Sequence, residues 1–86
     1  MTTIWKFPLM LDSLQTVAMP EGAEILYCGE QDRHLCLWAH VRPAAAKCER
    51  RFEIYWTGDP IPGIGRRRFL ATVQIGRHVH HVFELL

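Results

Sequence analysis

The sequence has 86 residues, of which 49% are apolar and 22% are charged, a balance typical of a globular domain that excludes a disordered chain. The formal net charge of +1 is too close to neutral for a general nucleic-acid binder. No apolar run reaches the roughly 18 residues of a membrane span, so we expect residues 1–86 to fold as one domain away from membranes.

Apolar and polar residues alternate along most of the chain, which predicts half-buried β-strands. The alternating segments, in chain order, are residues 3–9, 15–19, 23–29, 35–41, 51–57, 69–75 and 79–85. Turn-forming glycine, proline and aspartate residues separate these segments. The pattern predicts an all-β fold of about six antiparallel strands, packed as a small sandwich or barrel.

One segment has a composition that favours a helix. Residues 43–50, PAAAKCER, contain a proline suited to a first helical position, followed by three alanines. We therefore expect one short helical insertion in the all-β domain.

Large side chains also fall on the faces that alternation directs away from the core. These are Trp38, Tyr55, Leu70 and Val82. A sheet face in water rarely carries so much apolar area, so we expect part of it to be covered by another copy in a homo-oligomer.

Charge is distributed unevenly along the chain. Residues 1–32 carry a net charge of −4, and residues 33–86 carry +5. Solvated surfaces explain such a difference, but so would an anion site or an acidic and a basic surface that meet between subunits.

Several stretches occur together and in order: IWKFPL, MPEGAEIL, LWAHV, YWTGDPIP and HVFE. In these the whole chain resembles a family of small proteins of unknown function from phages and bacteria, although Asp59 stands where many of those proteins have histidine. The resemblance implies a phage accessory protein. By analogy it implies a sponge-like, anti-defence protein, since small oligomeric β proteins of phages include sponges for nucleotide messengers.

The stretch TGDPIPGIGRRR, residues 57–68, combines glycines and prolines with three successive arginines. It lacks the Lys-Ser/Thr pair of a phosphate-binding loop, and a strand follows it where that loop needs a helix. Arg66 and Arg68 would share one strand face, and guanidinium groups suit phosphate oxygens. A solvated turn and a contact to an acidic patch on another subunit are the alternatives.

Aromatic side chains on the outward faces extend the anion hypothesis. Trp38 and Tyr55 could stack on a base, while Arg42 and Arg51 provide further positive charge on the same strands. The same residue types also anchor protein–protein interfaces.

Catalytic and metal-binding patterns are weak. His78 and His80 share a strand face, but no second ligand cluster has recognisable spacing, so we expect no metal and no cofactor. We expect His78 and His80 to face solvent and His81 to lie among core residues. No nucleophile motif or carboxylate pair is present, and we expect no enzyme activity.

Three free cysteines without C-x-x-C spacing, Cys28, Cys36 and Cys48, indicate reduced thiols and a cytoplasmic location in the host cell. Together these features favour a non-enzymatic binding protein that captures a small, nucleotide-derived ligand through Arg66, Arg68, Trp38 and Tyr55. A module that docks on a host or phage protein is the alternative, and single-stranded nucleic-acid binding is a weaker one.

Overall fold

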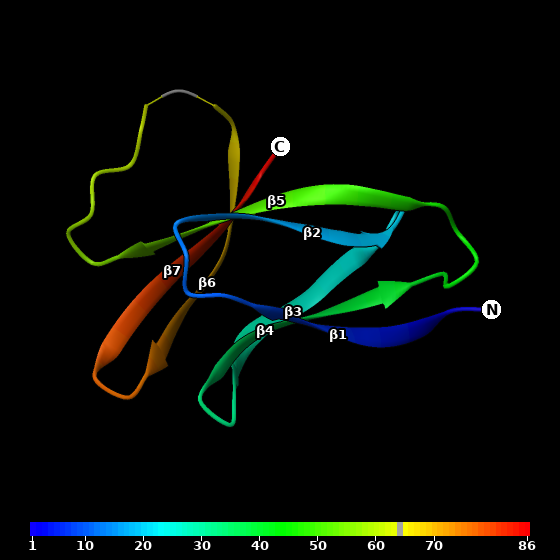
Figure 1. Cartoon of the computed structure of the whole chain (residues 1–86), viewed down its shortest axis with the longest axis horizontal. Helices are drawn as coiled ribbons and strands as arrows, with labels where there is room; N and C mark the ends of the chain where they lie inside the picture. Colours follow the sequence, from blue (N-terminus) through cyan, green and yellow to red (C-terminus); the bar gives the residue numbers. More distant parts are fainter. Residues whose placement is uncertain (64) are drawn as a thin grey trace.

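The computed structural model describes residues 1–63 and 65–86, and these residues form seven strands and no helix (Figure 1). The strands are β1 (Thr3–Leu9), β2 (Leu14–Pro20), β3 (Glu24–Gln31), β4 (His34–Val41), β5 (Lys47–Trp56), β6 (Arg67–Ile75) and β7 (His78–Leu85). The all-β prediction is confirmed, with one strand more than the six expected. No helix in this part of the chain is long and apolar enough to cross a membrane.

The strands form two antiparallel sheets that pack face to face. The three-stranded sheet has the order β1-β4-β3, and the four-stranded sheet has the order β2-β5-β7-β6. On one side of the sandwich the edge strands β3 and β6 lie against each other. Strands β1 and β2 are the edges on the other side, where Trp5, Phe7 and Val17 are only partly buried.

The hairpins follow from local turn chemistry. Asp32 and Arg33 both adopt positive φ, 51° and 67°, which is the backbone of a tight two-residue turn between β3 and β4. Gly76 has φ 61° in the matching turn between β6 and β7. These turns were expected from sequence, and they fix the register of the two hairpins.

The expected helix at residues 43–50 is wrong. Ala45 N donates to Arg42 O in a turn, and Glu21 N donates to Ala46 O, which fastens this turn to the β2–β3 connection. From Lys47 onward the chain is already strand, because it pairs with Pro20 and the rest of β2. Pairing with a neighbouring strand has overridden the weak helix preference of three alanines.

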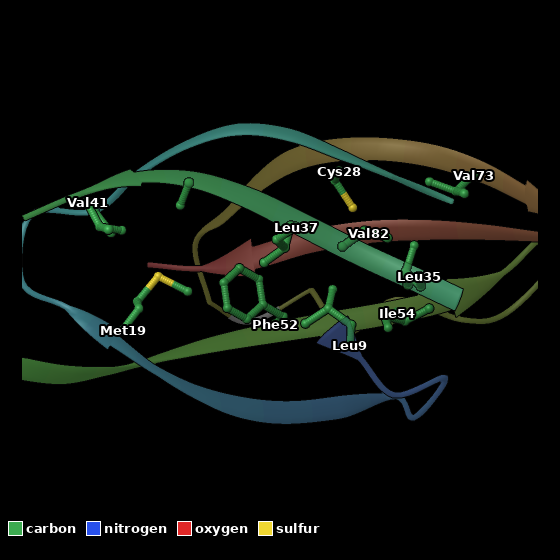
Figure 2. Close-up of a cluster of buried hydrophobic side chains, with 12 residues drawn as sticks. Leu9, Met19, Cys28, Leu35, Leu37, Val41, Phe52, Ile54, Val73 and Val82 are labelled. Carbon is green, nitrogen blue, oxygen red and sulfur yellow. The ribbon is translucent and has the colours of Figure 1, made fainter. Parts of the chain in front are cut away.

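The core lies between the sheets and receives side chains from all seven strands (Figure 2). Phe52 is its largest fully buried member, and Met19, Leu35, Leu37 and Val82 are also fully buried. Val82 was expected on an outer face, but it pairs with Ile54 and points inward. Burying one such side chain contributes about 1.5–3 kcal/mol.

Two bulges move side chains to faces that alternation does not predict. The register shifts between Ile25 and Tyr27 and again between Phe69 and Ala71. Because a bulge adds one residue to a strand, every later side chain changes face. Phe69 is therefore on the outer face, and Leu70 packs against the core although it was expected outside.

An ion pair between β5 and β7 lies on the inner side of the four-stranded sheet, inside the sandwich. Arg50 Nε lies 2.6 Å from Glu84 Oε2, and Arg50 Nη2 lies 2.9 Å from Glu84 Oε1. Arg50 Nη1 also donates to Ala23 O, next to the three-stranded sheet. The hydrogen bonds that Arg50 donates to Glu84 raise the pKa of Arg50 despite its partial burial, so the guanidinium stays charged.

Candidate functional site

Trp38 and Tyr55, the aromatic residues expected to stack on a ligand, lie on opposite sides of the sandwich. Trp38 is on the outer face of the three-stranded sheet, with its ring 5.7 Å from that of Tyr27. Tyr55 is on the outer face of the four-stranded sheet, because its neighbour Ile54 points into the core. The two sheets separate these rings, so one chain cannot place both on one ligand.

The four predicted arginines are also dispersed. Arg51 is exposed on the outer face of β5, whereas Arg42 lies in the β4–β5 connection. Arg66 and Arg68 are both exposed near the start of β6, on the face that Arg67 does not share. The structure therefore brings together only Arg66 and Arg68 of the predicted set.

Arg67, which the sequence analysis did not select as a site residue, is the arginine of this run that forms an ion pair in the fold. Its Nε and Nη2 donate to the two carboxylate oxygens of Glu53, and its Nη1 donates to Pro62 O at 3.0 Å. The β5–β6 connection is thereby fastened to the outer face of the four-stranded sheet. This connection includes residue 64, which lies outside the described residues.

The environment of Glu53 keeps its carboxylate ionised. Burial alone would raise the pKa of Glu53, but hydrogen bonds from Arg67 and Tyr55 and the charges of Arg67 and Arg51 hold it below its usual value. Burial, together with the bond to Glu53, raises the pKa of Tyr55. The three side chains form a hydrogen-bonded polar cluster that stabilises the structure.

Glu53 of this cluster belongs to a row of side chains that crosses the outer face of the four-stranded sheet and is otherwise apolar. The registers place Leu14, Glu53, Phe83 and Phe69 opposite one another on the four strands. The rings of Phe69 and Phe83 are 5.5 Å apart and meet edge to face, and Phe69 is 57% exposed. We name the surface formed by Leu14, Phe69, Phe83, Leu85 and Arg51 the Phe69 face.

The Phe69 face combines exposed rings with one free guanidinium. Leu14 is exposed, Phe83 and Leu85 are half-buried, and Arg51 has no ion-pair partner among the described residues. Tyr55, next to Phe83, is only 7% exposed, so it supports the face from below. Aromatic side chains beside an arginine are the residues most often found at the centre of protein interfaces.

His80 and His81 lie on the faces opposite to those predicted from the alternating sequence pattern. His80, expected to face solvent, is buried, while His81, expected in the core, lies on the outer face. Thr57 and Thr72 satisfy the two ring nitrogens of His81 at 2.8 and 3.0 Å. The pKa of His80 is lowered by burial first and then by His78 and His81.

A hollow at the far end of the sandwich contains Arg42. Its larger part has a volume of about 390 Å³ and its smaller part about 160 Å³, and both are lined by Arg42 and Glu21. Glu24 and His40 line the smaller part. Two carboxylates beside one guanidinium disfavour a polyphosphate, because its charge would be repelled more than attracted.

Comparison with known proteins supplies the family. A family model described as a domain of unknown function, DUF7352, matches residues 1–86. The chain belongs to the DUF7352 family. No curated protein and no solved structure matches this DUF7352 chain, so no activity or ligand comes to it from a relative.

Proposed function

We propose that this DUF7352 protein is a non-enzymatic binding module that docks on another protein through the Phe69 face. The exposed Phe69 ring, packed against Phe83 on a sheet whose other side forms the core, is the observation that carries the proposal. The Phe69 ring lies outside the core between the sheets and leaves apolar surface in water, which is typical of an interaction site.

The Phe69 face is a better candidate than either hollow. Its rings are fixed by edge-to-face contacts among Phe69, Phe83 and Tyr55, so few side-chain rotamers are lost on binding. The Arg67–Glu53 pair beneath is already satisfied and needs no partner. Docking therefore costs little desolvation at the centre and removes the apolar row from water.

The chemistry of the face defines the partner. Exposed Leu14 and Phe69 require apolar side chains opposite them, and Arg51 requires a carboxylate at the rim. We infer a protein partner with an apolar patch bordered by at least one Asp or Glu. A rim charge of this kind affects mainly the association rate and its salt dependence.

The test is cross-linking of the purified chain in a lysate of the organism that encodes it, followed by titration calorimetry with the purified captured protein. We expect Phe69→Ser to weaken binding at least about tenfold, as at a binding hot spot. Tyr27→Ser, an exposed aromatic on the opposite sheet, is the matched control and should change binding less than about twofold. Equal binding by Phe69→Ser and the unchanged protein would overturn the proposal.

Analytical ultracentrifugation tests whether the Phe69 face instead binds a second copy of the chain. If the unchanged protein is a dimer, Phe69→Ser is a monomer and no other protein binds, the Phe69 face is a subunit interface. That result would overturn the proposal of a separate partner.

A second candidate function is the capture of a small phosphate-bearing signal of a bacterial host, as in a phage anti-defence sponge. The observation that favours it is that Arg66 and Arg68 are exposed together and have no ion pair within the described chain. Since Trp38 and Tyr55 lie on opposite sides of one chain, an aromatic wall would need a second copy.

Native mass spectrometry against cyclic nucleotides and ADP-ribose derivatives tests this second function. A bound, intact nucleotide that is lost in Arg66→Ala/Arg68→Ala and kept in Phe69→Ser would support it. No binding at micromolar nucleotide would exclude it.

A further inference from the structure

A cluster of three rings lies at the end of β5 and the start of β7, away from the Phe69 face. Trp56 pairs with His80 across the two strands, and His78 lies two residues earlier on the same face of β7. The Trp56 ring is 4.7 Å from the His78 ring and 5.1 Å from the His80 ring, both in edge-to-face geometry. One indole therefore contacts both imidazoles.

His80 is unusual among the buried residues because it lacks a polar partner. It is 1% exposed, and its Nδ1 has no hydrogen-bond partner in the described structure. Buried ring nitrogens are nearly always paired, so an unpaired one is a candidate ligand atom. Its neighbours His78 and Trp56 are both exposed, Trp56 by 45%, so the cluster borders solvent, and a ligand would reach the buried Nδ1 by displacing these two side chains.

The side chains available in this cluster restrict which metal ion it could bind. Among residues 1–63 and 65–86, no three His, Cys, Asp or Glu side chains come together. A tetrahedral zinc site needs three or four protein ligands, so two imidazoles alone do not make one. Monovalent copper accepts two nitrogen ligands, imidazole suits copper, and the face of an indole attracts a cation.

We propose that His78 and His80 bind one monovalent copper ion, with the indole of Trp56 covering it. The ion would fill the unpaired position at the His80 ring and would lie where an indole can stabilise its charge. The site shares no residue with the Phe69 face, so this inference does not depend on the proposed function.

The test is an anaerobic titration of the folded chain with Cu(I) supplied as its acetonitrile complex. Since thiolates bind Cu(I) and Cys48 is only half-buried, the titration uses a Cys48→Ala background. Native mass spectrometry gives the number of ions bound, and tryptophan fluorescence reports their position. We expect one ion per chain and quenching that is absent in Trp56→Phe.

Three histidine variants distinguish copper bound at His78 and His80 from non-specific binding. His78→Gln changes an exposed residue, so it should fold normally and weaken Cu(I) binding at least about tenfold. His40→Gln is the matched control on the other sheet and should leave binding unchanged. His80→Gln, which alters a buried residue, is interpreted only together with its circular dichroism.

X-ray absorption at the copper edge identifies the ligand atoms. Two nitrogen neighbours would support the assignment. Sulfur neighbours, undiminished binding in His78→Gln, or tight binding of Zn²⁺ with none of Cu(I) would each overturn it.

Discussion

Arg67 on β6 reaches across β7 to bind the carboxylate of Glu53 on β5. The two residues are separated by a whole strand, because the sheet order is β5-β7-β6. The guanidinium crosses between the positions of Phe83 and Leu85, which pair with Glu53 and Arg67 respectively. This pair joins three strands and the β5–β6 connection, and it supports the Phe69 face.

The Arg67–Glu53 pair predicts a pH dependence of stability. The pKa of Glu53 is lower in the folded chain than its value of about 4.3 in an unfolded chain. The unfolded state then binds more protons as pH falls, so stability is fully present above about 4.3 and is lost as pH falls through the folded pKa.

Urea unfolding of Glu53→Gln against the unchanged protein measures this contribution. The variant should be less stable at neutral pH, and the difference should shrink below a pH of about 4. A difference that is constant with pH would show that Glu53 gains nothing from its charge.

The Arg50–Glu84 pair, which lies inside the sandwich, should contribute more to the free energy of unfolding than the Arg67–Glu53 pair. Arg50→Met leaves the buried Glu84 carboxylate without a partner, which should cost roughly 3 kcal/mol of unfolding free energy. Arg51→Met, the adjacent exposed arginine, should change stability by less than about 0.5 kcal/mol. Equal effects of the two variants in urea unfolding would contradict a role of Arg50 in joining the sheets.

Whether alanine at Gly29 stabilises or destabilises the protein should depend on the neighbouring Tyr27 side chain. A Cβ at Gly29 would lie 2.6 Å from Tyr27 Cζ, so Gly29→Ala must push the Tyr27 ring away from Trp38. We expect a cost of about 1 kcal/mol, the value of one aromatic pair.

In a Tyr27→Ala background, the same Gly29→Ala change should stabilise the strand by up to about 1 kcal/mol, because alanine loses less backbone entropy than glycine. A thermal-denaturation cycle of the four proteins measures both values. If Gly29→Ala had the same sign in both backgrounds, the ring would not be the cause of its cost.

The cysteines predict selective alkylation. Burial, and then the neighbouring Cys36, raises the pKa of Cys28 to about 12, so its thiol stays protonated and unreactive. Cys36 is also buried, whereas Cys48 is half-buried. Iodoacetamide at mildly alkaline pH should modify Cys48 first, and peptide mass spectrometry should find Cys28 unmodified until the chain is denatured.

The sequence predicted the strands because each carries an alternating pattern, and it predicted the hairpin turns from the short connection at residues 29–33 and from Gly76. The positive φ of Asp32 and Arg33 was not predicted. The sequence did not reveal the bulges at β3 and β6, since a single extra residue leaves alternation intact on either side of it. Leu70 was therefore assigned to the surface, although it packs against the core.

The candidate site was harder to predict than the strands. Recognising Arg67, and not Arg66 or Arg68, as the paired arginine would have required knowing that β7 lies between β5 and β6, which is a property of strand order and not of local sequence. Grouping Trp38 with Tyr55 failed for the same reason, because outward residues of different sheets face opposite ways. His80 and His81 exchanged roles because apolar residues occur on both faces of β7.

Chemical-shift mapping of the ¹⁵N-labelled protein with its captured partner tests the docking proposal most directly. If the Phe69 face is the docking surface, the largest amide shifts will lie on β5, β6 and β7 around Arg51, Phe69 and Phe83. Shifts centred on Tyr27 and Trp38, or on the hollow at Arg42, would contradict it.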